Sequence, residues 1–178
     1  MSSALVVIDM LNAYDHPDAD KLVSSVEETV PNIAALIERA RDEDVPVIYV
    51  NDNYGDWNSS AEELLRNGLE GERPDLVEPV KPPGEAKFVI KARHSIFFGT
   101  PLEYLLNQEG LDRLIMAGQV TEQCILYSAL DAYVRQFEVA VPADAVAHIH
   151  PDLADASLRM MELNMKADVA PSAECVLR

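Results

Sequence analysis

Three side chains with complementary chemistry stand where strands of a sheet would end. Asp9 follows an apolar run at the N-terminus, Lys91 follows another run near the middle of the chain, and Cys124 lies shortly after a third. A thiol can act as a nucleophile, a carboxylate can take up its proton and return it to a leaving amine, and an ammonium can stabilise the thiolate and orient the carboxylate. Together these residues predict covalent catalysis by a cysteine.

The position of Cys124 favours a reactive thiol. Thr121, a good N-cap residue, stands three residues before it, so we expect Cys124 in the first turn of a helix. Unpaired N–H groups and the positive end of the helix dipole would then lower the pKa of the thiol. Each member of the trio also has a structural explanation: a cysteine is often a small buried apolar residue, a strand-end aspartate often caps a turn, and a strand-end lysine is usually solvated.

Strand-like and helix-like segments alternate along the chain. Short apolar runs predict strands at residues 4–9, 47–50, 88–90, 114–117, 138–141 and 168–170. Helical spacing of apolar residues predicts helices at 20–44, 61–67, 102–108, 121–136 and 151–165, the first of them kinked or restarted by Pro31. This alternation indicates a three-layer, Rossmann-like α/β domain with a parallel sheet. Ligands of such sheets bind outside the carboxyl ends of the strands, where Asp9, Lys91 and the turn before Cys124 are expected.

Composition limits the classes of function. The 178 residues, 48% of them hydrophobic, suffice for one domain over residues 1–178 with a sizeable core. A formal net charge of -17 and a pI near 4.4 would repel phosphate backbones and anionic membranes, so neither nucleic acid nor a membrane is an expected partner. The acidic residues are spread along the chain, which indicates a solvated surface, although a salt-adapted host or attraction of cationic substrates would also fit.

The cellular compartment follows from the cysteines and the apolar segments. Cys124 and Cys175 cannot form a disulfide framework, and no apolar stretch is long enough for a signal-peptide core or a membrane span. We therefore expect a cytoplasmic protein with reduced thiols.

Three motifs resemble those of the isochorismatase-like cysteine hydrolases, in order and over essentially the whole chain. They are ALVVIDMLNAY with Asp9, FVIKARHSIFFGTPL with Lys91, and LIMAGQVTEQCILYSALDAY with Cys124. The resemblance implies an Asp–Lys–Cys triad at these positions and a six-stranded sheet of order 3-2-1-4-5-6. It also implies homo-oligomers, here a dimer or tetramer, and a non-proline cis peptide, which maps to the bond between Gln119 and Val120. That bond would aim the N–H groups of Val120 and Cys124 at the oxyanion of a tetrahedral intermediate.

Departures from the family pattern narrow the reaction. Family members that cleave a vinyl ether lack the cysteine, because that reaction proceeds by protonation, so Cys124 favours amide-type substrates. Nicotinamidases carry an Asp-x-His metal motif where this chain has Asp52-Asn53-Tyr54. His148 and His150 suit a ligand pair but lack a third partner, so neither a metal nor another cofactor is expected.

Aromatic side chains near the predicted site are expected to form the mostly apolar wall of a small-molecule cleft. The expected substrate-binding residues are Tyr14, Asn53, Trp57, Phe97, Phe98 and Tyr127. Phe97 and Phe98 would equally suit the core, and Trp57 a subunit interface.

The sequence thus predicts a hydrolase that cleaves a C–N bond of a small amide, ureide or lactam through a thioester on Cys124. Substrates of the thiol-bearing relatives include nicotinamide, N-carbamoylsarcosine, ureidoacrylate, maleamate and the lactam of streptothricin. The sequence does not indicate which of these compounds this chain would cleave. Two alternatives stay open, namely vinyl ether hydrolysis without the thiol and a non-catalytic binding domain of the same fold.

Overall fold

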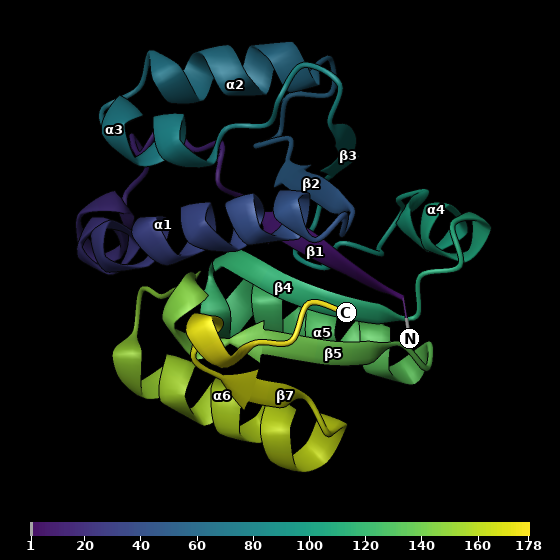
Figure 1. Cartoon of the computed structure of the whole chain (residues 1–178). Coiled ribbons are helices and arrows are strands. Elements are labelled where there is room, and N and C mark those ends of the chain that lie inside the picture. Colours follow the sequence, from purple (N-terminus) through teal and green to yellow (C-terminus); the bar gives the residue numbers. More distant parts are fainter. Residues whose placement is uncertain (1) are drawn as a thin grey trace.

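The computed structural model describes residues 2–178 and contains one twisted parallel sheet with helices on both faces (Figure 1). The strands are β1 (Ser3–Ile8), β2 (Val47–Asp52), β3 (Lys87–Lys91), β4 (Arg113–Gln119), β5 (Glu138–Pro142), β6 (Val146–Ala147) and β7 (Asp168–Ala170). The α-helices are α1 (Ala19–Asp42), α2 (Ala61–Leu69), α3 (Pro74–Val77), α4 (Leu102–Gln108), α5 (Leu126–Val134) and α6 (Pro151–Met165). These elements confirm the three-layer α/β fold expected from the alternating pattern.

The order of the strands is β3-β2-β1-β4-β5-β7, and every pairing is parallel. This confirms the expected order, because β7 is the sixth of the expected strands. The two-residue β6, which was not expected, pairs with the end of β4 at Gly118 and Gln119.

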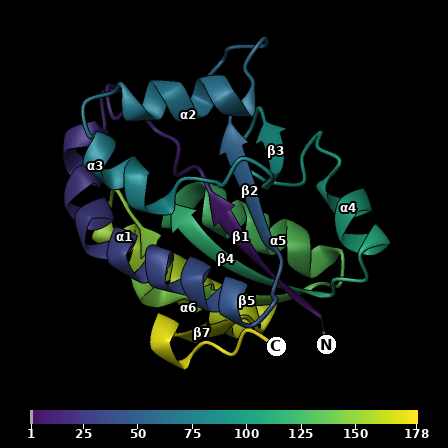
Figure 2. The same cartoon turned by 45° about the horizontal axis from the view of Figure 1, so that its top comes forward.

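The central strand β1 carries apolar residues on both faces because both faces are covered. Leu5 and Val7 pack into a core shared with α1, whereas Ala4, Val6 and Ile8 pack into a second core shared with α4, α5 and α6. A strand buried on both sides has no polar face, which explains the uninterrupted apolar run. Figure 2 shows α1 on one face of the sheet and α5 on the other.

The first helix differs from its prediction at Pro31. α1 runs as one helix from Ala19 to Asp42 with Pro31 inside it, so of the two expected effects, a kink or a restart, the restart is wrong. Pro31 is exposed, while Val30 and Ile33 beside it are buried against the sheet. Packing of this apolar face outweighs the loss of one backbone hydrogen bond.

The chain order leaves a crevice at one edge of the sheet. From β1 the chain continues to β2 on one side, while β4 lies on the other side of β1, so the connections leave the carboxyl ends of β1 and β4 in opposite directions. Such a switch point is where open α/β sheets bind ligands. None of the helices among residues 2–178 is long and apolar enough to cross a membrane.

Candidate active site

Asp9 is fixed by several contacts directly after β1. Its backbone adopts a left-handed conformation (φ 56°), its N–H donates to the Val50 carbonyl at 2.9 Å, and its carbonyl accepts from the Gln119 amide at 2.6 Å. One carboxylate oxygen accepts the Asp52 N–H at 2.7 Å, and the other lies 2.9 Å from Lys91 Nζ. The carboxylate is therefore held in one orientation by groups from β2 and β3, while β2 and β4 hold the backbone of Asp9.

A close approach of two backbones brings β4 against Asp9. Gly118 has φ 122°, and a Cβ atom at this position would lie 2.1 Å from the Ile8 carbonyl oxygen. Only glycine fits here. The approach places Gln119 where its side chain can donate to the Asp9 carbonyl, which ties the turn before Cys124 to the end of β1.

Lys91 reaches the centre of the site from β3 across the end of β2. Its side chain is fully buried, and Nζ lies 2.9 Å from Asp9 Oδ2, 3.1 Å from Asp52 Oδ2 and 3.6 Å from Cys124 Sγ. Asp52 is the residue opposite Lys91 in the β2–β3 register, so its carboxylate stands between β3 and β1. The long lysine side chain thus spans one strand, and Asp52 supports it on the way.

The turn that carries Cys124 agrees only in part with the prediction. The bond between Gln119 and Val120 is cis, as expected. Residues Thr121–Ile125 form a π-helical turn that precedes α5, with Cys124 inside it. Thr121 does not cap this helix, because its hydroxyl donates to the Ala147 carbonyl at 2.8 Å, so that part of the prediction is wrong.

The expected lowering of the thiol pKa is also wrong. Burial, followed by the nearby Asp9 carboxylate, raises the pKa of Cys124 above its usual value, although Lys91 acts in the opposite direction. Burial likewise raises the pKa of Asp9, against the opposing effect of Lys91. Burial lowers the pKa of Lys91, but Asp9, Cys124 and Asp52 outweigh it and raise that pKa overall. A protonated thiol therefore lies beside a permanent cation and a carboxylate that is a stronger base than usual.

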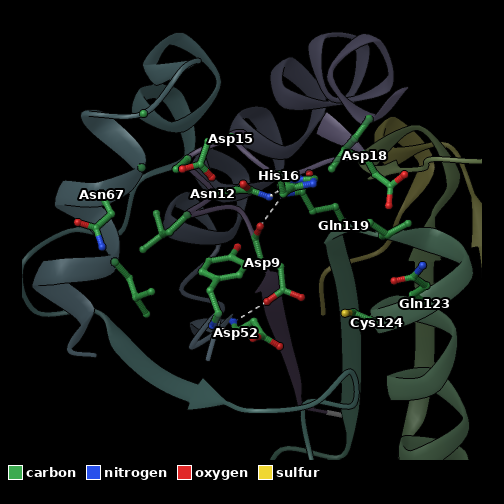
Figure 3. Close-up of a pocket in the computed structure, with 18 of the residues that line it drawn as sticks. Asp9, Asn12, Asp15, His16, Asp18, Asp52, Asn67, Gln119, Gln123 and Cys124 are labelled. Atoms are coloured by element: carbon green, nitrogen blue, oxygen red, sulfur yellow. Dashed lines mark hydrogen bonds between the residues drawn. The ribbon is translucent and has the colours of Figure 1, made fainter. Parts of the chain in front are cut away.

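These groups open into a cavity of about 720 Å³. Figure 3 shows Asp9, Asp52 and Cys124 pointing into the same space, with Asp15 and Asp18 near one end of it. The neutral amides Asn12, Asn67, Gln119 and Gln123 also line the cavity. No lysine or arginine lines the cavity, and its two imidazoles are His16 and His94. Its acidic residues are Asp9, Asp15, Asp18, Asp52 and Glu70.

The six expected substrate-binding residues do not line this cavity. Phe97 is buried in the core and stacks on Phe137 with ring centroids 5.8 Å apart, so core packing, the alternative weighed above, describes it. The buried Tyr14 hydroxyl donates to the Gln119 side chain at 3.5 Å, next to the turn that carries Cys124. Asn53 is buried too, and its side chain accepts the Gly55 N–H within a turn.

The remaining three of these residues are exposed. Trp57 is 83% exposed and Phe98 is 65% exposed, whereas Tyr127 is 44% exposed and packs edge-on against His94. A contact of any of them with substrate stays a prediction.

Val120 and Cys124 both line the cavity, as an oxyanion hole requires, and that role for their N–H groups stays a prediction. Among residues 2–178, no group of three or more histidine, cysteine, aspartate or glutamate side chains is arranged to hold a metal ion. Activity without a metal remains an expectation for experiment.

Sequence reasoning misses contacts of two residues at the centre of the site. Asp52 lines the cavity and accepts the Tyr54 N–H in a turn at 2.9 Å, but its residue type alone does not reveal that it also pairs with Lys91. His94 was not singled out, although its Nδ1 lies 3.7 Å from Cys124 Sγ. A titratable residue three positions after the lysine was the available signal, and only the fold could show that this segment turns back toward the thiol.

Comparisons with known proteins identify the family of this chain. A family model described as the isochorismatase domain matches residues 3–174. The uncharacterized isochorismatase family protein YaaI of Bacillus subtilis is 30% identical over 173 residues, which cover 97% of this chain and 96% of that protein. Maleamate amidohydrolase of Pseudomonas putida is 31% identical over 164 residues, covering 87% of this chain and 76% of that protein.

A solved structure gives the same result for the fold. The crystal structure of N-carbamoylsarcosine amidase from Thermoplasma acidophilum superposes with a TM-score of 0.77 at 28% sequence identity, covering 98% of this chain and 99% of that chain. With the match of the family model over nearly the whole sequence, these similarities show that the chain belongs to the isochorismatase family of hydrolases.

Proposed function

We propose that this chain is a cysteine amidohydrolase that cleaves a C–N bond of a small amide, ureide or lactam through a thioester on Cys124. One observation carries the proposal: the Asp9 carboxylate and the Cys124 thiol lie 2.9 and 3.6 Å from the fully buried Lys91 ammonium, and both line a cavity large enough for a small molecule. Vinyl ether hydrolysis proceeds by protonation and would leave this thiol without a role.

The first half of the reaction forms the thioester. Cys124 Sγ attacks the carbonyl carbon of the amide while its proton passes to Asp9. Asp9 then gives this proton to the amide nitrogen, the C–N bond breaks, and the amine leaves. The raised pKa of Asp9 suits both transfers, because a stronger base accepts the thiol proton more readily and a neutral carboxyl group can protonate a poor leaving group.

The second half releases the acid. Water attacks the thioester carbon, the C–S bond breaks, and one proton from the water is transferred to Cys124 Sγ, which restores the thiol. Lys91 keeps its charge throughout, because its raised pKa prevents it from exchanging protons. Its role is to hold Asp9 in place and to stabilise negative charge on sulfur.

The oxygen of the substrate carbonyl becomes negatively charged in both halves. We propose that the N–H groups of Val120 and Cys124 stabilise it, since both residues line the cavity next to the sulfur. Loss of one such donor typically lowers kcat about 100- to 1,000-fold.

The acidic lining of the cavity favours a substrate that carries no carboxylate. Maleamate, named in one relative, carries a carboxylate besides its amide, and such a group would meet the acidic lining and find no lysine or arginine there. We therefore propose neutral or cationic amides. Succinamate, butyramide and 4-aminobutyramide provide anionic, neutral and cationic probes of similar length, and kcat/KM should rise in that order.

Variants that each remove one negative charge distinguish the effect of the acidic cavity lining from the effect of the generally acidic surface. Asp15→Asn should raise kcat/KM for succinamate about threefold, because one nearby charge is removed. Asp42→Asn, at the far end of α1 and outside the cavity, should change it little. Equal turnover of all three probes, or equal effects of the two variants, would contradict the proposed substrate charge.

The catalytic proposal is tested by an ammonia-release screen over small amides, ureides and lactams, with isochorismate run beside them. Cys124→Ala should abolish turnover of any amide that the wild-type protein accepts, and Lys91→Ala should do so nearly as completely. Hydrolysis of isochorismate alone, at the same rate in Cys124→Ala, would favour the vinyl ether alternative. Binding of small molecules without any turnover would favour the non-catalytic alternative.

We also propose a homo-oligomer, in keeping with the resemblance described above. α5 exposes apolar side chains beside the site, namely Tyr127, Leu130, Tyr133 and Val134. Burial of such a patch against a second copy would stabilise both chains. Light scattering after size exclusion should give a multiple of 19.7 kDa, and Leu130→Glu should shift the protein toward the monomer.

A further inference from the structure

His94 stands beside the reactive sulfur without a role in the mechanism so far. Its Nδ1 lies 3.7 Å from Cys124 Sγ, about as far away as Lys91 Nζ at 3.6 Å. The two nitrogens differ in their surroundings. The Lys91 side chain is fully buried and lies outside the cavity lining, whereas His94 is exposed and lines the cavity with Cys124.

The segment that carries His94 is anchored to the helix that follows Cys124. Ser95 donates through its hydroxyl to Asp131, and the Ile96 N–H donates to the Ser128 hydroxyl at 3.1 Å. Both acceptors lie on α5, which continues from the turn of Cys124. The imidazole also packs edge-on against Tyr127 with ring centroids 5.4 Å apart. These contacts hold the ring near the sulfur.

Asp9, the other base in the site, already has a partner for each of its carboxylate oxygens. One oxygen of Asp9 faces Lys91 and the other accepts the Asp52 N–H. His94 Nδ1, in contrast, contacts the sulfur alone among the hydrogen-bonding groups of residues 2–178. A thioester carbon would be one covalent bond from this sulfur, so a water approaching it from the cavity passes next to the imidazole.

Resting on the thioester route proposed above, we propose that His94 is a catalytic residue of the second half of the reaction, the base that activates the hydrolytic water. Water attacks the thioester carbon and gives one proton to His94 Nδ1. The C–S bond then breaks, the acid leaves, and Nδ1 returns the proton to Sγ, which it already contacts. Every proton that the water gives up is thereby returned to the thiol, while Asp9 serves the amine in the first half.

An activated ester separates the two halves of the reaction. With 4-nitrophenyl acetate, formation of the thioester releases nitrophenolate and needs no proton for the leaving group, so hydrolysis of the thioester limits turnover. His94→Asn should keep a burst of one nitrophenolate per chain at a rate within a few fold of wild type. Its steady-state rate should fall about 100-fold, the usual contribution of a general base. His150→Asn, an exposed histidine outside the cavity, is the matched control and should behave as wild type.

Two further readouts distinguish a lost base from a distorted site. Mass spectrometry of the quenched His94→Asn reaction should show the acetyl adduct on Cys124, and hydroxylamine, a nucleophile that needs little help from a base, should restore turnover. An unchanged steady-state rate in His94→Asn would overturn the proposal, and so would a burst slowed as strongly as the steady state. Absence of any adduct or burst in the wild-type protein, with the same result in Cys124→Ala, would instead refute the thioester route on which the proposal rests.

Discussion

Asp9 and Asp52 form a natural pair of matched variants. Their carboxylates lie 2.9 and 3.1 Å from the same ammonium, so either can neutralise Lys91. They differ in their relation to the thiol. The Asp9 carboxylate raises the pKa of the Cys124 thiol, and its side chain is 9% exposed, whereas the Asp52 side chain is 24% exposed and caps the Tyr54 N–H. Of these two carboxylates, Asp9 is the one that we propose to exchange a proton with sulfur.

We therefore expect Asp9→Asn and Asp52→Asn to differ strongly in rate. Asp9→Asn removes the proton carrier, and kcat/KM for an amide should fall about 1,000-fold, equivalent to about 4 kcal/mol. Asp52→Asn leaves Lys91 paired with Asp9 and keeps an oxygen for the Tyr54 N–H, so a loss of about tenfold, or about 1.4 kcal/mol, is expected.

Thermal unfolding provides the control for stability. Removal of one partner from a buried ion pair typically costs about 3–5 kcal/mol because a charge is left unpaired, but Lys91 keeps one carboxylate in each variant. The loss should therefore stay below that range, and the two melting temperatures should be similar.

The pKa of the Cys124 thiol provides an independent test of Asp9 as the proton carrier. Asp9 contributes to the raised pKa of Cys124 and Lys91 opposes it, so Asp9→Asn should lower the thiol pKa. Alkylation of Cys124 by iodoacetamide should then extend to lower pH although amide turnover has nearly vanished. Equal losses of kcat/KM in Asp9→Asn and Asp52→Asn, or alkylation of Cys124 confined to higher pH in Asp9→Asn, would refute the assignment of Asp9 as the proton carrier.

Three other expectations concern acidity, packing and reactivity. Because the Asp9 carboxylate must be ionised to accept the thiol proton and burial raises its pKa, kcat/KM should fall toward low pH with an apparent pKa above the usual carboxyl value of about 3.8. Gly118→Ala should destabilise the protein by about 2–6 kcal/mol through a clash with β1 and a strained backbone, seen as a lower melting temperature; Gly84→Ala, with open space around it, is the control. Cys124 should alkylate faster than Cys175, because only Cys124 opens to the cavity, and peptide mapping would show the reverse order if this is wrong.

Much of the fold could be predicted from the sequence because its elements satisfy local rules. The helices at 102–108 and 151–165 and the strand at 168–170 have the bounds that their patterns predict. The order of the strands came from the family resemblance, since apolar runs do not specify which strands pair. The short β6 and the continuous α1 depend on tertiary contacts that outweigh local signals.

The catalytic candidates could be predicted from the sequence, but the residues that line the cavity could not. Strand ends in a parallel sheet lie at one edge, so Asp9, Lys91 and Cys124 could be expected to converge there, but how Lys91 reaches the site across the end of β2 could not be predicted. The direction of a side chain in a loop does not follow from its residue type, which is why Phe97 lies in the core and the cavity is lined by other residues. The pKa of Cys124 was predicted in the wrong direction because burial outweighs the helix terminus.

The raised pKa of the thiol is consistent with catalysis once the whole cluster is considered. Asp9, Asp52 and Lys91 together carry one net negative charge when Cys124 is protonated, and a resting thiolate would add a second charge in a largely buried site. Proton transfer from sulfur to Asp9 avoids this cost, because charge moves within the cluster and its sum is unchanged. The same holds when Asp9 protonates the leaving amine, since the negative charge returns to Asp9 as the neutral amine departs. What the site must still stabilise is the charge on the substrate oxygen, which is the role proposed for the N–H groups of Val120 and Cys124, so the proposed mechanism favours the transition state over a preformed ion.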